Sequence, residues 1–197
     1  MSQSRFSIFR SVKPEPDTTI ELRMPKTTMR APTYVPYVVD NLWEWKRPKS
    51  YPCRRFSVYA SPQEYLAKES GPEGGTVYKV EFKGKFKLCQ VKGWSDSRKH
   101  PDCRSLKKVL TKRLGQNWID GKLSEKEELG RLWIPCLTRD EMNYLFGSNE
   151  NLRNIRDEVY NAITYWNDVA LIKNGNPLPD PEGELFFEAE DGYYLEK

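Results

Sequence analysis

Histidine and clustered metal ligands are almost absent from this sequence of 197 residues. Its one histidine, His100, cannot build a site of several histidines, and its polar, basic surroundings predict a surface residue. None of the four cysteines lies within four residues of another, so the spacing of a zinc knuckle or a Cys-x-x-Cys redox motif is missing. We therefore expect no metal site, and thiols that are reduced and structural.

Long apolar runs are absent as well. The longest span only a few residues, such as Tyr37-Val38-Val39, whereas a membrane-spanning helix needs about 20. Residues 1–10 contain no apolar stretch of the kind found in secretory signals. We expect a cytoplasmic protein without a membrane partner, acting in the cell that makes it or, as a toxin or phage effector, in a host cytosol.

Several motifs of common enzyme classes are also missing. The chain has no phosphate-binding P-loop, no G-x-G-x-x-G dinucleotide fingerprint, no H-E-x-x-H zinc motif and no G-x-S-x-G nucleophile elbow. A Ser-His-Asp triad would have to use His100, for which the sequence offers no orienting partner. The chemistry, if any, must use other residues.

Charge is present in quantity but unevenly distributed along the chain. Residues 1–115 contain 24 Lys and Arg against 11 Asp and Glu, whereas residues 116–197 contain 8 against 17. One interpretation is a basic face that meets phosphate or another polyanion, and the other is charge complementarity between the two halves. We expect a single domain over 1–197, with a basic strand-rich part (1–115) and an acidic helix-rich part that ends in strands (116–197).

Hydrophobic periodicity predicts an α+β fold with a mostly antiparallel sheet, as one layer or as two packed sheets. Several helices are expected between early and late strands. Strands are predicted at 4–13, 54–60, 76–82, 85–91, 184–190 and 192–195, with 76–82 and 85–91 as a hairpin-like unit joined through Lys83-Gly84. Helices are predicted at 40–45, 61–70, 106–114, 124–131, 138–146 and 149–166, with a proline-rich extended connection over 14–36.

Two of these helices have sequence signals for capped N-termini. Ser61 precedes Pro62 and, three residues on, Glu64, which is typical of a Ser N-cap with a capping box. Thr138 and Glu141 have the same spacing. In isolation, Ser61 is therefore interpreted as a helix cap.

Three short segments of the chain are considered together as a possible functional site. The first is Phe9-Arg10-Ser11 on the first strand, and the second is Phe56-Ser57-Val58-Tyr59-Ala60-Ser61-Pro62, a strand that runs into a helix. The third is Pro181-Glu182-Gly183-Glu184-Leu185, where two carboxylates two residues apart open an apolar strand and point to the same side. Taken alone, each segment is typical of ordinary surface or capping residues.

In this order, the segments resemble ADP-ribosyltransferases of the Arg-Ser-Glu type. The resemblance implies NAD as substrate and a protein or nucleic acid as acceptor. It implies that Arg10 holds the NAD pyrophosphate and that Ser57 or Ser61, with Tyr59 between them, holds the nicotinamide ribose. Glu184 would stabilise the oxocarbenium charge and Glu182 would orient or deprotonate the acceptor. The middle segment departs from the family's Ser-Thr-Ser pattern.

The chemistry of such a reaction agrees with the composition. Nicotinamide leaves as a neutral molecule, so cleavage needs positioning and a nearby carboxylate rather than a metal or a histidine. An alternative is a non-enzymatic protein that binds nucleic acid or another protein through a basic, aromatic-rich face. That face would combine aromatic and basic residues, namely Trp43, Trp45, Tyr51, Tyr59 and Trp94 with Lys46, Arg47, Lys49, Arg54 and Arg55.

Overall fold

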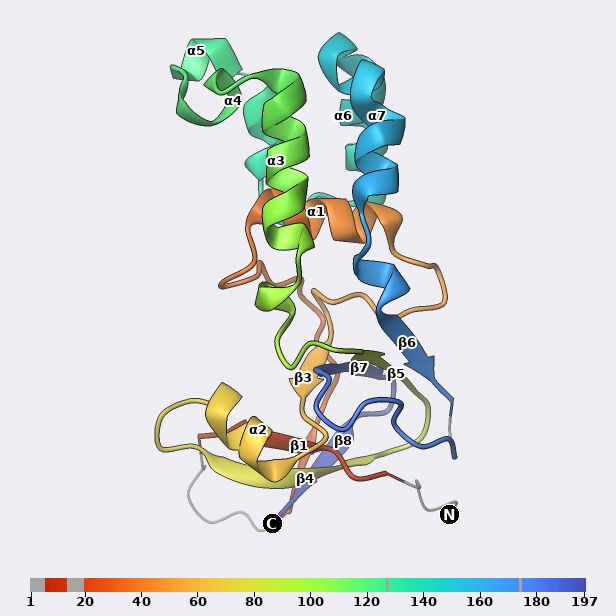
Figure 1. Cartoon of the computed structure of the whole chain (residues 1–197). Coiled ribbons are helices and arrows are strands. Elements are labelled where there is room, and N and C mark those ends of the chain that lie inside the picture. The colour runs from red at the N-terminus through yellow and green to blue at the C-terminus, as the bar shows by residue number, and fades with distance from the viewer. Residues whose placement is uncertain (1–5, 14–19, 127, 174) are drawn as a thin grey trace. The chain divides into compact units, whose positions relative to one another are not determined.

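The computed structural model describes residues 6–13, 20–126, 128–173 and 175–197, and it has the α+β architecture predicted from the sequence (Figure 1). Its contacts divide the chain into two compact units. The strand unit comprises Met1–Thr28, Lys49–Ser97 and Asp168–Lys197, and the helical unit comprises Met29–Pro48 and Arg98–Asn167. The single domain expected over 1–197 stays a prediction, and each unit is described by itself below.

The strand unit contains two antiparallel four-stranded sheets. Of the two arrangements predicted, one layer or two sheets, the structure has two sheets. In the first sheet the order is β1 (Phe9–Val12), β4 (Thr76–Phe82), β8 (Tyr193–Glu196) and β2 (Ile20–Arg23). In the second it is β3 (Val58–Ala60), β7 (Leu185–Ala189), β5 (Phe86–Val91) and β6 (Val169–Ile172). Apolar side chains of both sheets form one buried cluster, which includes Val12, Val80 and Leu195 from the first sheet and Leu88 and Phe187 from the second.

The predicted hairpin-like pairing of 76–82 with 85–91 is wrong. Both strands exist at nearly the predicted bounds, but β4 pairs with β1 and β8, whereas β5 pairs with β6 and β7. The short connection at Lys83-Gly84, where Gly84 adopts a positive φ of 72°, therefore carries the chain from one sheet to the other. Local alternation predicts strands, but their partners are set by the shared core.

The N-cap predicted at Ser61 is also wrong. The helix α2 spans Glu64–Ser70 and begins after Gln63, without a side-chain cap. Ser61 continues the extended backbone of β3, because its N–H donates to the Phe9 carbonyl and its own carbonyl accepts from the Phe9 N–H, both at 2.8 Å. Because its backbone forms these two strand-type hydrogen bonds, Ser61 belongs to the edge of the sheet and does not cap the helix.

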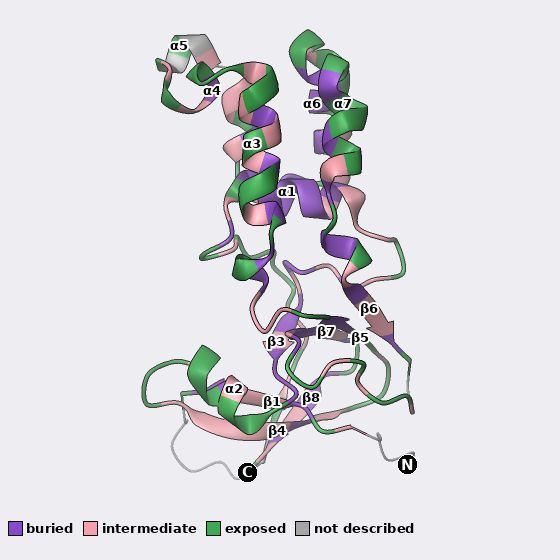
Figure 2. Ribbon diagram, in the orientation of Figure 1, coloured by how far each residue is buried: buried purple, intermediate pink, exposed green. Residues whose placement is uncertain are grey.

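The helical unit is built from α1 (Tyr37–Lys46), α3 (Asp102–Leu114), α6 (Arg139–Ser148) and α7 (Glu150–Ala162). Shorter elements are α4 (Asn117–Asp120), α5 (Leu123–Lys126) and the 3₁₀ turns at Ser97–Lys99, Leu129–Trp133 and Tyr165–Asn167, the first of which begins at the last residue of the strand unit. Most of α1 is buried, as Figure 2 shows, because it packs on α3 and α6. The capping box predicted at Thr138 and Glu141 is confirmed at the start of α6.

His100 is buried in the helical unit, so the prediction of a surface residue is wrong. Its ring meets Trp43 and Tyr165 edge-on, and only 1% of the residue is exposed. The buried Asp102 carboxylate next to it accepts hydrogen bonds from Trp43 Nε1, from Thr164 N and Oγ1, and from Tyr165 N. Asp102 thus joins α1, α3 and the segment after α7, and local polarity around His100 did not reveal this packing.

The charge asymmetry along the chain is largely internal complementarity in the strand unit. By sequence, that unit holds 16 Lys and Arg and 16 Asp and Glu, whereas the helical unit holds 16 against 12. Antiparallel pairing brings basic early strands next to the acidic C-terminal ones, with Lys79 opposite Glu196 and Lys87 opposite Glu188. The net positive charge of the chain therefore belongs to the helical unit.

Candidate functional site

The strands that carry the three sequence segments are neighbours in the strand unit. β1 is joined to the end of β3 by the Phe9–Ser61 bridge, and β3 pairs along its length with β7. The last pair of that ladder is Ala60 with Leu185, so Ser61 and Glu184 follow directly as the next opposing positions. Arg10, the residue after Phe9, lies on the adjoining strand. The segments, far apart in sequence, meet at one end of β3.

Glu184 is fixed by both its backbone and its carboxylate. Its N–H donates to the Trp94 carbonyl and its own carbonyl accepts from Val91 N, so the residue is anchored beyond the end of β5. Its Oε2 accepts hydrogen bonds from the hydroxyl and the N–H of Ser97, and it lies 3.6 Å from Arg54 Nη1. The carboxylate therefore has one defined orientation.

Burial raises the pKa of Glu184 above its ordinary value. The attraction of Arg54 and the hydrogen bonds from Ser97 act in the opposite direction, while nearby Asp96 adds to the increase. The side chains of Glu184 and Arg54 are only 16% and 8% exposed, which explains why desolvation dominates. A carboxylate held in partly dry surroundings is the kind of group that acts strongly on a developing positive charge.

Arg54 is a site residue that the sequence reasoning assigned elsewhere. Its guanidinium carbon lies 5.2 Å from the centre of the Tyr59 ring and 5.3 Å from that of Phe186, so the cation lies close to two aromatic rings. Nη1 also donates to Ser97 Oγ at 2.9 Å. The signal in the sequence is the Arg54-Arg55 pair directly before a strand, but basic pairs are usually exposed and these two are buried.

The loop that leads into Glu184 is held by Asp180. Its Oδ1 accepts from the N–H groups of Glu182 and Gly183, and its Oδ2 accepts from Gly93 N. Burial raises the pKa of Asp180, but the three backbone donors outweigh this and hold it below its ordinary value. Gly183 lies so close to β5 that an added Cβ would be 2.2 Å from the Val91 carbonyl oxygen, so only glycine fits there.

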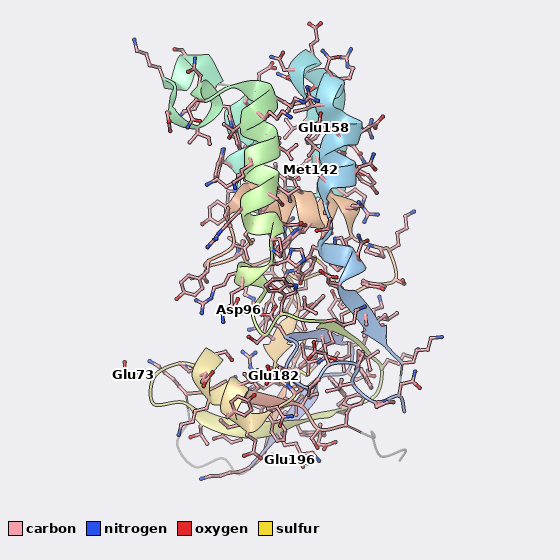
Figure 3. All side chains as sticks on the ribbon, in the orientation of Figure 1. Glu73, Asp96, Met142, Glu158, Glu182 and Glu196 are labelled. Carbon is pink, nitrogen blue, oxygen red and sulfur yellow. The ribbon has the colours of Figure 1, made fainter. Side chains whose placement is uncertain are left out.

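Glu182 lies beside α2 on the exposed side of this loop, as labelled in Figure 3. Its Oε1 accepts a hydrogen bond from the Tyr65 hydroxyl at 3.1 Å. This hydrogen bond is the main reason why the pKa of Tyr65 is raised. Glu182 and Glu184 thus differ in environment: the first faces solvent and the second is enclosed.

The remaining predicted residues are placed as follows. Arg10 donates one N–H, from Nη1, to the Tyr59 carbonyl at 2.6 Å, which ties β1 to the middle of β3. The Tyr59 hydroxyl donates to the Arg54 carbonyl, and Ser57, fully buried, donates its hydroxyl to the Cys53 carbonyl in the preceding turn. The Ser57 hydroxyl is therefore used locally, and Ser61 is the serine that follows the last β3–β7 pair, Ala60 with Leu185.

The residues proposed for a basic, aromatic face are divided between the two units, and several of them are buried. Trp43 and Trp45 are 0% and 3% exposed in the core of the helical unit, while Tyr59 and Arg54 belong to the strand unit. In the helical unit, Lys46 donates to the carbonyls of Tyr160 and Ile163. Most of these side chains thus take part in packing.

Within the described ranges, no helix is both long and apolar enough to cross a bilayer. The same residues contain no group of three or more His, Cys, Asp or Glu side chains arranged to hold a metal ion. Comparisons with models of protein families, with curated proteins and with solved structures find no match for this chain. The function is therefore inferred from the geometry of the site.

Proposed function

We propose that the protein is an NAD-dependent mono-ADP-ribosyltransferase-like enzyme that transfers ADP-ribose to a protein or nucleic-acid acceptor and releases nicotinamide. The observation that carries the proposal is the adjacency of β1, β3 and β7, which brings Arg10, Ser61 and Glu184 to one end of β3. These residues come from three separate segments whose order along the chain resembles that of the Arg-Ser-Glu transferases. Neighbouring strands bring the backbones of these residues together, and a shared NAD site would also require their side chains to face one cleft.

In this proposal Glu184 acts on the reacting sugar. When the bond between nicotinamide and ribose breaks, positive charge develops on the ribose, and a preorganised carboxylate stabilises it without having to move. Ser97 and Arg54 are positioning residues, because they orient the Glu184 carboxylate and act to lower its pKa, which burial raises. Glu182, exposed two residues earlier, would meet the acceptor and accept its proton.

Arg10 and Ser61 would bind the rest of the NAD molecule. Arg10 donates to the Tyr59 carbonyl through Nη1, and in this proposal its guanidinium would bind the pyrophosphate through charge-assisted hydrogen bonds. Ser61 would contact the nicotinamide ribose from the position opposite Glu184. Binding through several fixed contacts would hold the reacting carbon close to the carboxylate, which is the main requirement of this chemistry.

The proposal is tested by nicotinamide release from NAD with the purified protein, with and without a cell lysate. Glu184→Gln should reduce release on the order of 10²–10³-fold, because it removes one preorganised charge from the transition state. Glu190→Gln makes the same chemical change just beyond β7 and should leave release unchanged. Glu190→Gln should keep the thermal unfolding midpoint of the parent protein within a few degrees. Glu184→Gln leaves Arg54 without its carboxylate and should lower the midpoint, so circular dichroism at the assay temperature must show that this variant is folded.

The lysate distinguishes the forms of the activity. Release that requires lysate and Glu184 identifies a transferase, and labelled NAD then marks its acceptor. Release without lysate identifies an NAD hydrolase. Release that is absent in both conditions, or equal in the two variants, contradicts the proposal.

A further inference from the structure

The helical unit contains a cavity of about 380 Å³ into which three arginines project. Arg47 follows the end of α1, Arg139 is the first residue of α6 and Arg156 lies in the middle of α7. The remaining lining comprises Trp45, Asn143, Asp157 and Tyr160. No residue of the proposed NAD site takes part, so the cavity is a separate feature of the helical unit.

Each guanidinium is held on one side by the protein. Arg47 forms a close ion pair with Glu44, at 2.9 Å between Nη2 and Oε1. The main-chain carbonyl of Arg47 accepts a hydrogen bond from Arg139 Nη2. Arg156 Nη2 donates to Asn143 Oδ1 at 3.2 Å, and the same oxygen accepts from Trp45 Nε1. The arginine side chains are therefore preorganised, which lowers the entropy cost of binding a ligand.

The positive charge of this cavity is only partly compensated. Glu44 offsets Arg47, but within the described part of the chain no carboxylate comes within ion-pair distance of Arg139 or Arg156. Arg156 instead lies over the Trp45 ring, with 5.9 Å between its guanidinium carbon and the ring centre. One acidic residue, Asp157, shares the lining with the three arginines. An anion is therefore the natural occupant.

We propose that this cavity binds a phosphate group presented by a nucleotide or by a single-stranded nucleic acid. An arginine fork matches two phosphate oxygens at once, and the lining contains arginines from two different helices, Arg139 and Arg156. Tyr160 is 39% exposed and on the same lining; Lys46 Nζ lies over its ring at 5.0 Å from the centre, so a base attached to the phosphate would stack on the other face. The proposal does not depend on activity at Glu184.

The test measures binding of inorganic phosphate and AMP by calorimetry, and of fluorescein-labelled 12-residue single-stranded DNA and RNA by anisotropy. Arg156→Gln should weaken binding of the occupant about tenfold or more, because it removes a charge-assisted contact. Arg153→Gln is the matched control: it removes the same charge from the same helix, at a side chain that donates to the Gly147 carbonyl outside the cavity. It should change affinity by less than about twofold.

A second pair of variants separates binding from folding. Arg139→Gln should weaken binding by a similar factor. Arg139→Lys keeps the charge but loses the fork, so its affinity should lie between those of Arg139→Gln and the parent protein. Binding of phosphate or AMP, lost in these variants, assigns a small-molecule site. Binding of the oligonucleotides alone, with a salt slope reduced by about 0.7 in Arg156→Gln, assigns a nucleic-acid site. Equal effects of Arg153→Gln and Arg156→Gln, or no binding of any probe, overturn the proposal.

Discussion

Replacing Arg54 by glutamine should lower the free energy of unfolding by about 3–5 kcal/mol at pH 8, since it leaves the enclosed Glu184 carboxylate without its cation. The magnitude agrees with the geometry. At the 3.6 Å between Arg54 Nη1 and Glu184 Oε2, two charges attract by about 5 kcal/mol at an effective dielectric constant of about 20. The contacts of the guanidinium with the Tyr59 and Phe186 rings would be lost as well.

The pH dependence of this loss follows from the raised pKa of Glu184. A carboxyl with a folded-state pKa above its unfolded value binds its proton more tightly when folded, so stability falls as pH rises from the unfolded pKa through the folded one. Without Arg54 the folded-state pKa of Glu184 rises further, so the pH range over which stability falls extends to higher pH. The difference between the variant and the parent should therefore shrink as pH falls from 8 toward about 4.3, the ordinary value for glutamate.

Urea unfolding at several pH values, followed by tryptophan fluorescence, measures this effect. The double variant Arg54→Gln/Glu184→Gln should be more stable at pH 8 than Arg54→Gln alone, because the unpaired charge is gone. Lys79→Gln, which removes an exposed partner of Glu81, is the control and should cost less than about 1 kcal/mol. A loss that is the same at every pH, or additive effects in the double variant, would refute an energetically coupled ion pair.

Three further predictions concern other parts of the molecule. Gly183→Ala should destabilise the protein by about 1–3 kcal/mol in urea unfolding and reduce nicotinamide release, since its Cβ would clash with the Val91 carbonyl; parent-like values for both would contradict the close approach. Asp102→Asn should cost about 3 kcal/mol or more by the same assay, because an amide cannot accept all the hydrogen bonds that converge there, and a loss below about 1 kcal/mol would contradict this. In a pH–rate profile of kcat/KM, nicotinamide release should fall on acidification at a pH above the ordinary glutamate value, because Glu184 must be ionised and its pKa is raised; a fall only below that value would count against Glu184.

Local signals in the sequence were sufficient for several elements. Alternation predicted β4 at its bounds, the apolar spacing predicted α3 and α7, and the Thr138–Glu141 box predicted the start of α6. These elements have a pattern that is complete within one segment. By contrast, β2 and β6 were not predicted, because a four-residue strand carries too little periodicity to be distinguished from a connection.

What could not be predicted depends on contacts between distant segments. Ser61 has the sequence of a helix cap but the backbone of a strand, since Phe9 offers it two main-chain hydrogen bonds from another part of the chain. Arg54 has the sequence of a surface cation, but it is buried close to two aromatic rings with Glu184 as its ion-pair partner. For the same reason Ser97, which holds Glu184, could not be recognised as a site residue from its own neighbourhood.

The pairing of β5 with β6 sets a condition on how the chain folds. Val91 is the register partner of Val169, and Lys92 N donates to the Asp168 carbonyl, so the long intervening segment leaves and returns at a single point of the sheet. Closing such a loop costs entropy before any strand contact compensates for it, whereas the helices within it gain contacts that are local in sequence. We infer that helix formation precedes completion of this sheet. Ser97 can reach Glu184 only after that closure, so the candidate site is among the last parts of the molecule to form.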